Sequence, residues 1–147
     1  MALNYNWTAL KAKVDAMKSD GYTNQPIGLV WGWHALSTTQ PMNAPAINDK
    51  KTQQYIVLLS DGENTQNRWW SSWGAESKIN ARQKKVCDNI KADGIQIFTV
   101  LLIEGNESVM KDCASDASMF YHLKSSGEVI SAFDDISTKI SKLRIAQ

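Results

Sequence analysis

The sequence has few of the features that mark non-globular or membrane-embedded chains. Three prolines and eight glycines among 147 residues exclude collagen-like and proline-rich chains. No apolar run approaches the roughly 18–20 residues that a membrane-spanning helix needs, and the longest, residues 95–103, is interrupted by Gln96 and Thr99. The first residues also lack the charged start and apolar core of a signal peptide.

The sequence also lacks an excess of charge of either sign. Sixteen basic and fifteen acidic residues give a formal net charge of +1. That balance argues against nucleic-acid binding and against a general attraction to anionic membranes. The hydrophobic share of 43% and the charged share of 21% are typical of a globular chain, and the length suits one domain with a real core.

Hydrophobic periodicity predicts three strands that alternate with helices. The strands are expected at residues 55–60, 95–103 and 119–123, and the helices at residues 8–18, 27–36, 77–92, 107–113 and from residue 129 onward. The strands are apolar on both faces, which is typical of a parallel sheet covered by helices on both sides. The sequence therefore predicts an α/β fold, a three-layer arrangement with a mostly parallel sheet.

Six tryptophans are unusual in a chain of this size. Trp7 is expected to anchor the first helix, and Trp31 and Trp33 are expected in the core because their helix is apolar on nearly every side. The others follow the strand 55–60 in a polar loop beside Arg68: Trp69, Trp70 and Trp73. Such a composition is typical of a protein-binding patch and equally of a loop that buries its rings locally, with stacking on a sugar as a further alternative.

Two oxygen-bearing side chains are predicted at the edge of the sheet where ligands bind in such folds. Asp61 ends the segment YIVLLSDG, and Thr23 precedes the second helix. A carboxylate and a hydroxyl are hard oxygen ligands that suit Mg²⁺, Ca²⁺ or Mn²⁺. Asp61 is equally typical of a turn before glycine, and Thr23 of a helix-entry cap.

Several segments together resemble the C-terminal part of a von Willebrand factor A domain, and more narrowly the TadG-like proteins of Tad/Flp pilus assembly in bacteria. They are GYTNQPIGLVWGWHAL, YIVLLSDGENTQNRW, CDNIKADGIQIFTVLLIEG, KDCASD with FYHL, and SKLRIAQ. The resemblance implies a partial von Willebrand factor A or Rossmann-like fold without its first strands. Residues 1–147 are then expected to form a single, truncated domain.

In that family a metal-ion-dependent adhesion site is built from an Asp-x-Ser-x-Ser motif, a later Thr and a later Asp. Thr23 and Asp61 match the last two, whereas no Asp-x-Ser-x-Ser occurs in the sequence. Two ligands are too few for a cation that takes about six. The expected site is incomplete and empty, with no cofactor in this chain and Mg²⁺ or Mn²⁺ in a full-length domain.

The resemblance implies a non-catalytic protein-interaction segment outside the cytoplasm, in the periplasm or cell envelope, from a membrane-anchored parent protein. Its partners would be proteins of a pilus or secretion apparatus. A homodimer through the bare edge of the strand 55–60 is also expected, because unpaired apolar edges attract other strands. The alternatives are a purely structural assembly domain and a hydrolase that uses Asp61.

The resemblance also bears on the two cysteines, Cys87 and Cys113. An extracytoplasmic location is oxidising, which favours a disulfide between them. Two buried thiols, each acting as a small hydrophobic side chain, are the alternative.

Overall fold

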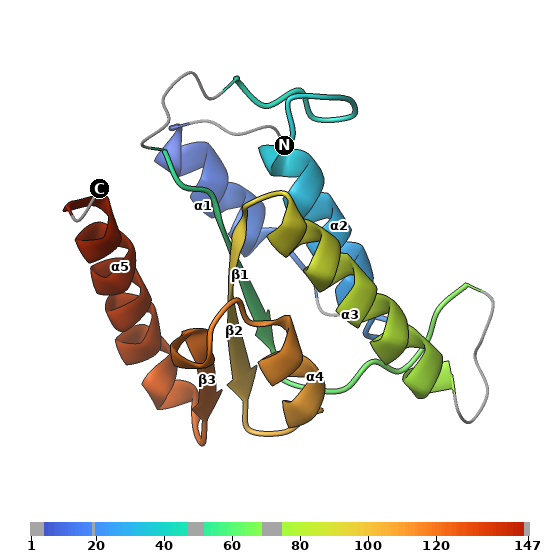
Figure 1. Cartoon of the computed structure of the whole chain (residues 1–147). Coiled ribbons are helices and arrows are strands. Elements are labelled where there is room, and N and C mark those ends of the chain that lie inside the picture. Colours follow the sequence, from blue (N-terminus) through green and yellow to red (C-terminus); the bar gives the residue numbers. More distant parts are fainter. Residues whose placement is uncertain (1–4, 19, 47–51, 69–74, 146–147) are drawn as a thin grey trace.

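The structure is a computed structural model that describes residues 5–18, 20–46, 52–68 and 75–145. Helices and strands alternate along these residues (Figure 1). They are α1 (Trp7–Asp15), α2 (Gln25–Leu36), β1 (Tyr55–Ser60), α3 (Ala75–Ala92), β2 (Gln96–Leu102), α4 (Glu107–Cys113), β3 (Phe120–Leu123) and α5 (Val129–Ile145), with 3₁₀ turns at Ala117–Met119 and Ser126–Glu128.

The three described strands form one parallel sheet in the order β1-β2-β3. In the register, Leu58 lies beside Thr99 and Thr99 lies beside Phe120. The central strand β2 is buried from Ile97 to Leu101, so both of its faces are covered. The predicted parallel α/β arrangement is therefore confirmed.

Helices cover the sheet on both faces, which gives the three predicted layers (Figure 1). On one face Leu29 of α2, Ile90 of α3 and the two cysteines pack around Ile97. On the other face α5 places Ala132 and Ile136 against the β2 residues Phe98 and Val100. Before α5 the Ser125 hydroxyl donates to the Glu128 carboxylate at 3.0 Å, but the Ser125 side chain caps no backbone N–H, so a capping box does not form.

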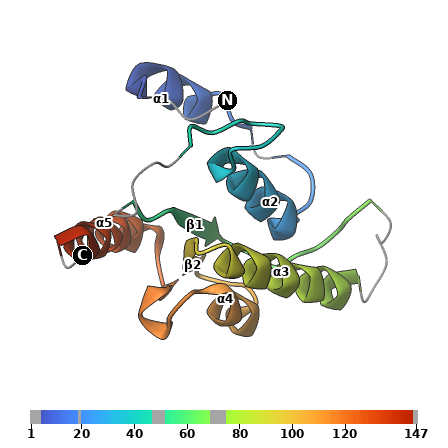
Figure 2. The same ribbon diagram turned by 45° about the horizontal axis from the view of Figure 1, so that its top comes forward.

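Helix α1 does not pack as its amphipathic pattern predicted. None of its residues is buried, Trp7 is 72% exposed, and Val14 and Met17 are also exposed. Figure 2 shows α1 standing apart from the sheet. The expectation that Trp7 anchors this helix is wrong, because an apolar stripe anchors a helix only where a complementary face meets it.

Helix α2 is also less buried than predicted. Its buried residues are Gln25, Pro26 and Leu29, while Trp31 is 51% exposed. The placement of Trp31 in the core is therefore wrong. Trp33 is partly buried against the core, and its indole N–H donates to Asp93 at 2.9 Å.

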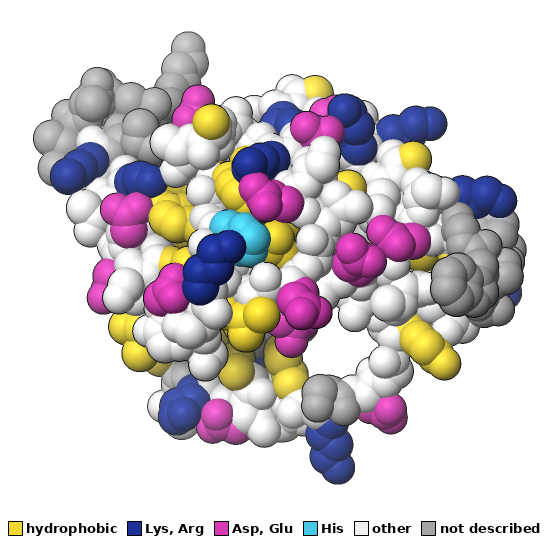
Figure 3. Space-filling view, turned by 90° about the horizontal axis from the view of Figure 1, so that it is seen from below, with side chains coloured by type: hydrophobic (Ala, Val, Ile, Leu, Met, Phe, Trp, Pro, Cys, Tyr) yellow, Lys and Arg dark blue, Asp and Glu magenta, His cyan; other side chains and the backbone are white. Residues whose placement is uncertain are grey.

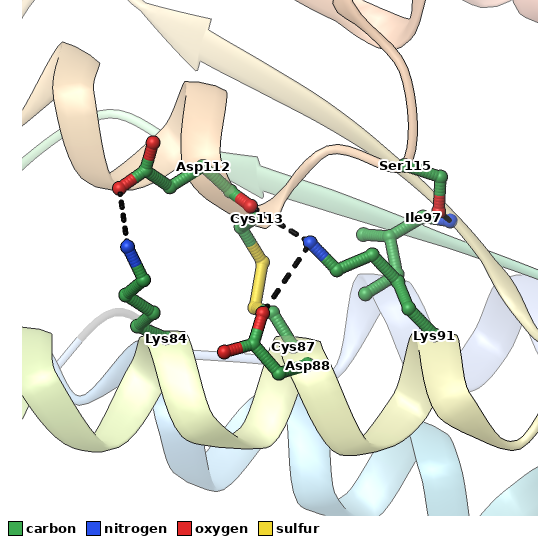
Figure 4. Close-up of polar contacts among 8 residues, drawn as sticks. All are labelled: Lys84, Cys87, Asp88, Lys91, Ile97, Asp112, Cys113 and Ser115. Atoms are coloured by element: carbon green, nitrogen blue, oxygen red, sulfur yellow. Dashed lines mark hydrogen bonds and ion pairs between the residues drawn. A yellow bond between two sulfur atoms is a disulfide. The ribbon is translucent and has the colours of Figure 1, made fainter.

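A disulfide joins α3 to α4 (Figure 4). Cys87 and Cys113 are bonded, with 5.2 Å between their Cα atoms, so the predicted pair is present and the alternative of two thiols is not. Ion pairs and a hydrogen bond flank it: Lys84 lies 3.2 Å from Asp112, and Lys91 donates to the Asp112 carbonyl at 2.9 Å. The covalent link fixes the two helices on one face of the sheet.

Candidate functional site

The loops that carry Thr23 and Asp61 lie side by side at the carboxyl ends of the strands. The Thr23 N–H donates to the Thr65 hydroxyl at 2.9 Å, and the Thr65 N–H donates to the Thr23 carbonyl at 3.0 Å. Thr23 is half-buried and Asp61 is exposed. The sequence placed both residues at this edge, and the reciprocal bonds join the loop before α2 to the loop after β1.

Three side-chain amides form a closed ring beneath these loops. The Gln25 backbone N–H donates to Asn64 Oδ1 at 2.8 Å, Asn64 Nδ2 donates to Gln83 Oε1 at 2.6 Å, and Gln83 Nε2 donates to Gln25 Oε1 at 2.7 Å. All three residues are buried, and Gln83 is fully so. A buried polar network with its groups paired fixes one geometry, because every alternative leaves a group without a partner.

The amide ring, formed by Gln25, Asn64 and Gln83, extends to the end of β1. Gln25 Nε2 also donates to the Ser60 hydroxyl at 2.9 Å and to the Gly62 carbonyl at 3.0 Å. The chain on either side of Asp61 is thereby attached to α2 and, through Gln83, to α3. The ring holds the loop of Asp61 in place without contacting the carboxylate itself.

Sequence reasoning missed this ring, although one signal for it was present. Gln83 lies on the apolar stripe of its helix, four residues after Ile79 and four before Cys87. A polar residue within such a stripe is buried with the rest of it and must find hydrogen-bond partners. That spacing could have identified Gln83, whereas nothing in the sequence indicated that Asn64 and Gln25 would meet it.

The loop after β2 closes tightly against the loop after β1. Gly105 has a φ of +141°, and a Cβ atom at this position would lie 2.7 Å from Leu101 and 3.0 Å from the Gly62 carbonyl. Both the backbone conformation and the lack of space require glycine. The turn at Gly62, directly after Asp61, is therefore supported from a second side.

Charged groups surround a histidine farther along this edge. The face seen in Figure 3 shows acidic and basic side chains gathered around a histidine. His122 Nδ1 lies 3.4 Å from the Glu107 carboxylate, and Lys111 lies 2.6 Å from the same carboxylate. The hydrogen bond and charge of Lys111 lower the pKa of Glu107 below its ordinary value. This contact brings His122 of β3 next to Glu107 of α4.

Among the described residues, no group of three or more His, Cys, Asp or Glu side chains could hold a metal ion together. Thr23 and Asp61 supply one hydroxyl and one carboxylate, and a hard divalent cation takes about six oxygen ligands. By themselves, these two described residues do not make up a complete metal centre.

The aromatic loop predicted as a partner-binding patch is only partly described. Arg68 is exposed, while Trp69, Trp70 and Trp73 lie outside the described residues. The patch therefore stays a prediction for those three tryptophans.

The sequence matches no protein-family model and no curated protein. The fold is similar to solved structures of proximal thread matrix protein 1 from the mussel byssus. One crystal form gives a TM-score of 0.60 at 15% identity over 95% of this chain, and a form with a zinc-occupied MIDAS motif gives 0.59 at 15% identity over the same share. The chain spans 28% of the length of each of these proteins.

These comparisons and the sheet topology establish a von Willebrand factor A-like α/β fold. At this identity the likeness concerns the fold alone. A search of the described residues found no helix long and apolar enough to cross a membrane.

Proposed function

We propose that the chain is a non-catalytic protein-interaction segment of an extracytoplasmic, TadG-like pilus-assembly protein. The proposal depends on one observation: the loops at the carboxyl ends of the strands are held in place by the packing and hydrogen bonds around them. The amide ring and Gly105 hold the loops of Thr23 and Asp61 in one geometry while Asp61 faces solvent. A rigid scaffold that presents an exposed loop is how interaction domains reduce the entropic cost of binding.

The cellular setting rests on separate support. The Cys87–Cys113 disulfide is the kind of bond that persists in oxidising compartments such as the periplasm or cell envelope. The TadG-like assignment, and with it a membrane-anchored parent protein, rests on the sequence motifs that surround Asp61 and the two cysteines.

Metal is not required for the proposed contact. We infer that Thr23 and Asp61 are a remnant of a metal-ion-dependent adhesion site, because the sequence has no Asp-x-Ser-x-Ser motif to supply further oxygen ligands. Mg²⁺ or Mn²⁺ would bind only where a full-length domain adds the missing ligands.

A second copy of the chain is one proposed partner, paired at the outer edge of β1. No other described strand pairs with this edge, and Leu59 is 45% exposed beside it. Unpaired strand edges recruit strands from other chains, and a charged side chain at the edge prevents this. Leu59→Lys should therefore convert a dimer to a monomer in light scattering, while Ile130→Lys, at an exposed position on α5, should leave the dimer intact. A wild-type chain that remains monomeric at millimolar concentration would contradict this pairing.

Binding to purified pilins and assembly proteins of a Tad apparatus tests the proposed function itself. The immobilised chain should capture at least one of them, equally with Mg²⁺ or EDTA in the buffer. Arg68→Glu should weaken the capture and Lys13→Glu, a control on α1, should not. Failure to bind any of these proteins would overturn the TadG-like assignment, and loss of binding in EDTA would overturn its independence of metal.

A further inference from the structure

A cavity of about 610 Å³ opens between α2 and α3, separate from Thr23 and Asp61. Its walls are largely apolar: Ile27, Val30 and Trp31 come from α2, and Ile79 and Val86 from α3. Ile79 is 1% exposed, whereas Ile27 and Trp31 are more than half exposed. The volume lies within the range of about 300–1,000 Å³ that small-molecule sites occupy.

The charged side chains that line the cavity are all basic. Arg68, Arg82 and Lys85 line it together with His34, and no described lining residue is acidic. Arg82 and Lys85 lie three residues apart on α3, so both extend from the same face of the helix. In a chain whose net charge is only +1, three cationic side chains around one apolar cavity are a local concentration of positive charge.

We propose that this cavity binds a small organic anion with an apolar body, of the class of a medium-chain carboxylate. The hydrocarbon part lies against the apolar walls. This contact is favourable because it removes the exposed surfaces of Ile27 and Trp31 from water. The carboxylate faces Lys85 and the two arginines, whose charge and N–H groups complement it. The site shares Arg68 with the proposed protein contact but not Thr23 or Asp61, since neither of these lines it.

Titration with three probes of equal chain length tests the proposal: decanoate, decanol and decyltrimethylammonium. The readout is the indole N–H resonance of Trp31 in the ¹⁵N-labelled chain, assigned with Trp31→Phe. Decanoate should shift this resonance in a saturable way, more tightly than decanol, and the cation should bind at least about tenfold more weakly than decanoate. Added salt should weaken decanoate binding and leave decanol unchanged.

Two variants and a control locate the site. Lys85→Glu should weaken decanoate binding about tenfold, equivalent to about 1.4 kcal/mol, and should narrow the preference for the anion over the cation. Val30→Trp should abolish binding of all three probes by filling the cavity, with near-UV circular dichroism as the check that it folds. Lys13→Glu removes a positive charge on α1, away from the cavity, and should change nothing.

The proposal is overturned if decanoate and the cation bind equally, or if no probe produces a saturable Trp31 shift. It is also overturned if Lys85→Glu and Lys13→Glu have the same effect. Each of these results leaves the proposed protein-interaction function standing, because that function is tested with protein partners and, at Leu59, with a residue that does not line the cavity.

Discussion

Replacing Gln83 with leucine should destabilise the chain, and the contacts of Gln83 set the size of the effect. The substitution removes the partner of Gln25 Oε1 and one of the two partners of Asn64 Nδ2, both of them buried. The Gln25 oxygen and one N–H of the Asn64 amide, both left unpaired, cost about 2–6 kcal/mol together. A buried leucine returns about 1.5–3 kcal/mol of hydrophobic stabilisation. We expect a net loss of about 2 kcal/mol in the free energy of unfolding.

Urea denaturation at neutral pH, with the disulfide intact, measures this loss. At an m-value of about 2 kcal/mol/M the midpoint should fall by about 1 M. Asn89→Leu, an exposed amide on the same helix, is the matched control and should change the free energy by less than about 0.5 kcal/mol. Hydrogen exchange at the Thr65 amide, which bonds the Thr23 carbonyl, should accelerate in Gln83→Leu. A midpoint within the error of the wild type, together with unchanged Thr65 exchange, would refute the proposed bracing role of the amide ring.

Two further predictions concern the covalent and electrostatic links. Reduction of the Cys87–Cys113 disulfide should lower the free energy of unfolding by about 3.5 kcal/mol, because the bond closes a loop over a sequence separation of 26 residues and so restricts the unfolded chain. Denaturation with and without dithiothreitol measures this difference, and an unchanged midpoint would contradict it. Hydrogen bonds from the Tyr121 hydroxyl, at 2.6 Å, and from Lys139 lower the pKa of Asp135 below its ordinary value of 3.8. The ionised carboxylate therefore stabilises the fold above about pH 4. This contribution is lost as the pH falls through the folded-state pKa. Asp135→Asn should therefore lose less stability than the wild type between pH 5 and pH 2, and equal losses would show that Asp135 contributes nothing.

The periodicity of the chain predicted the topology because β2 is apolar on both faces, and only a layer of helices on each side satisfies such a strand. A local signal also marks the start of α4: asparagine is a residue type favoured at a helix N-cap, and the Asn106 side chain accepts from the Val109 N–H at 3.1 Å. These features depend on residues close together in the sequence, so short patterns contain the information.

The predictions that were wrong concern the surface against which a helix packs. The stripe of α1 predicted a helix correctly, but the exposure of Trp7 depends on the absence of a facing surface among the described residues, which no local pattern reports. Trp31 is half exposed because it borders the open cavity between α2 and α3. At the candidate site, the positions of Thr23 and Asp61 followed from the strand ends and the family motif, whereas the ring that braces them joins residues up to 58 positions apart.

The central claim is that the edge around Thr23 and Asp61 serves protein contact without holding a metal ion. Isothermal titration calorimetry of the chain with Mg²⁺ and Mn²⁺ tests it most directly, with Asp61→Ala as the control. We expect no saturable binding of Mg²⁺ or Mn²⁺ in the micromolar range, either to the wild-type chain or to Asp61→Ala. Micromolar binding that disappears in Asp61→Ala would contradict it and would make this edge a metal-dependent adhesion site.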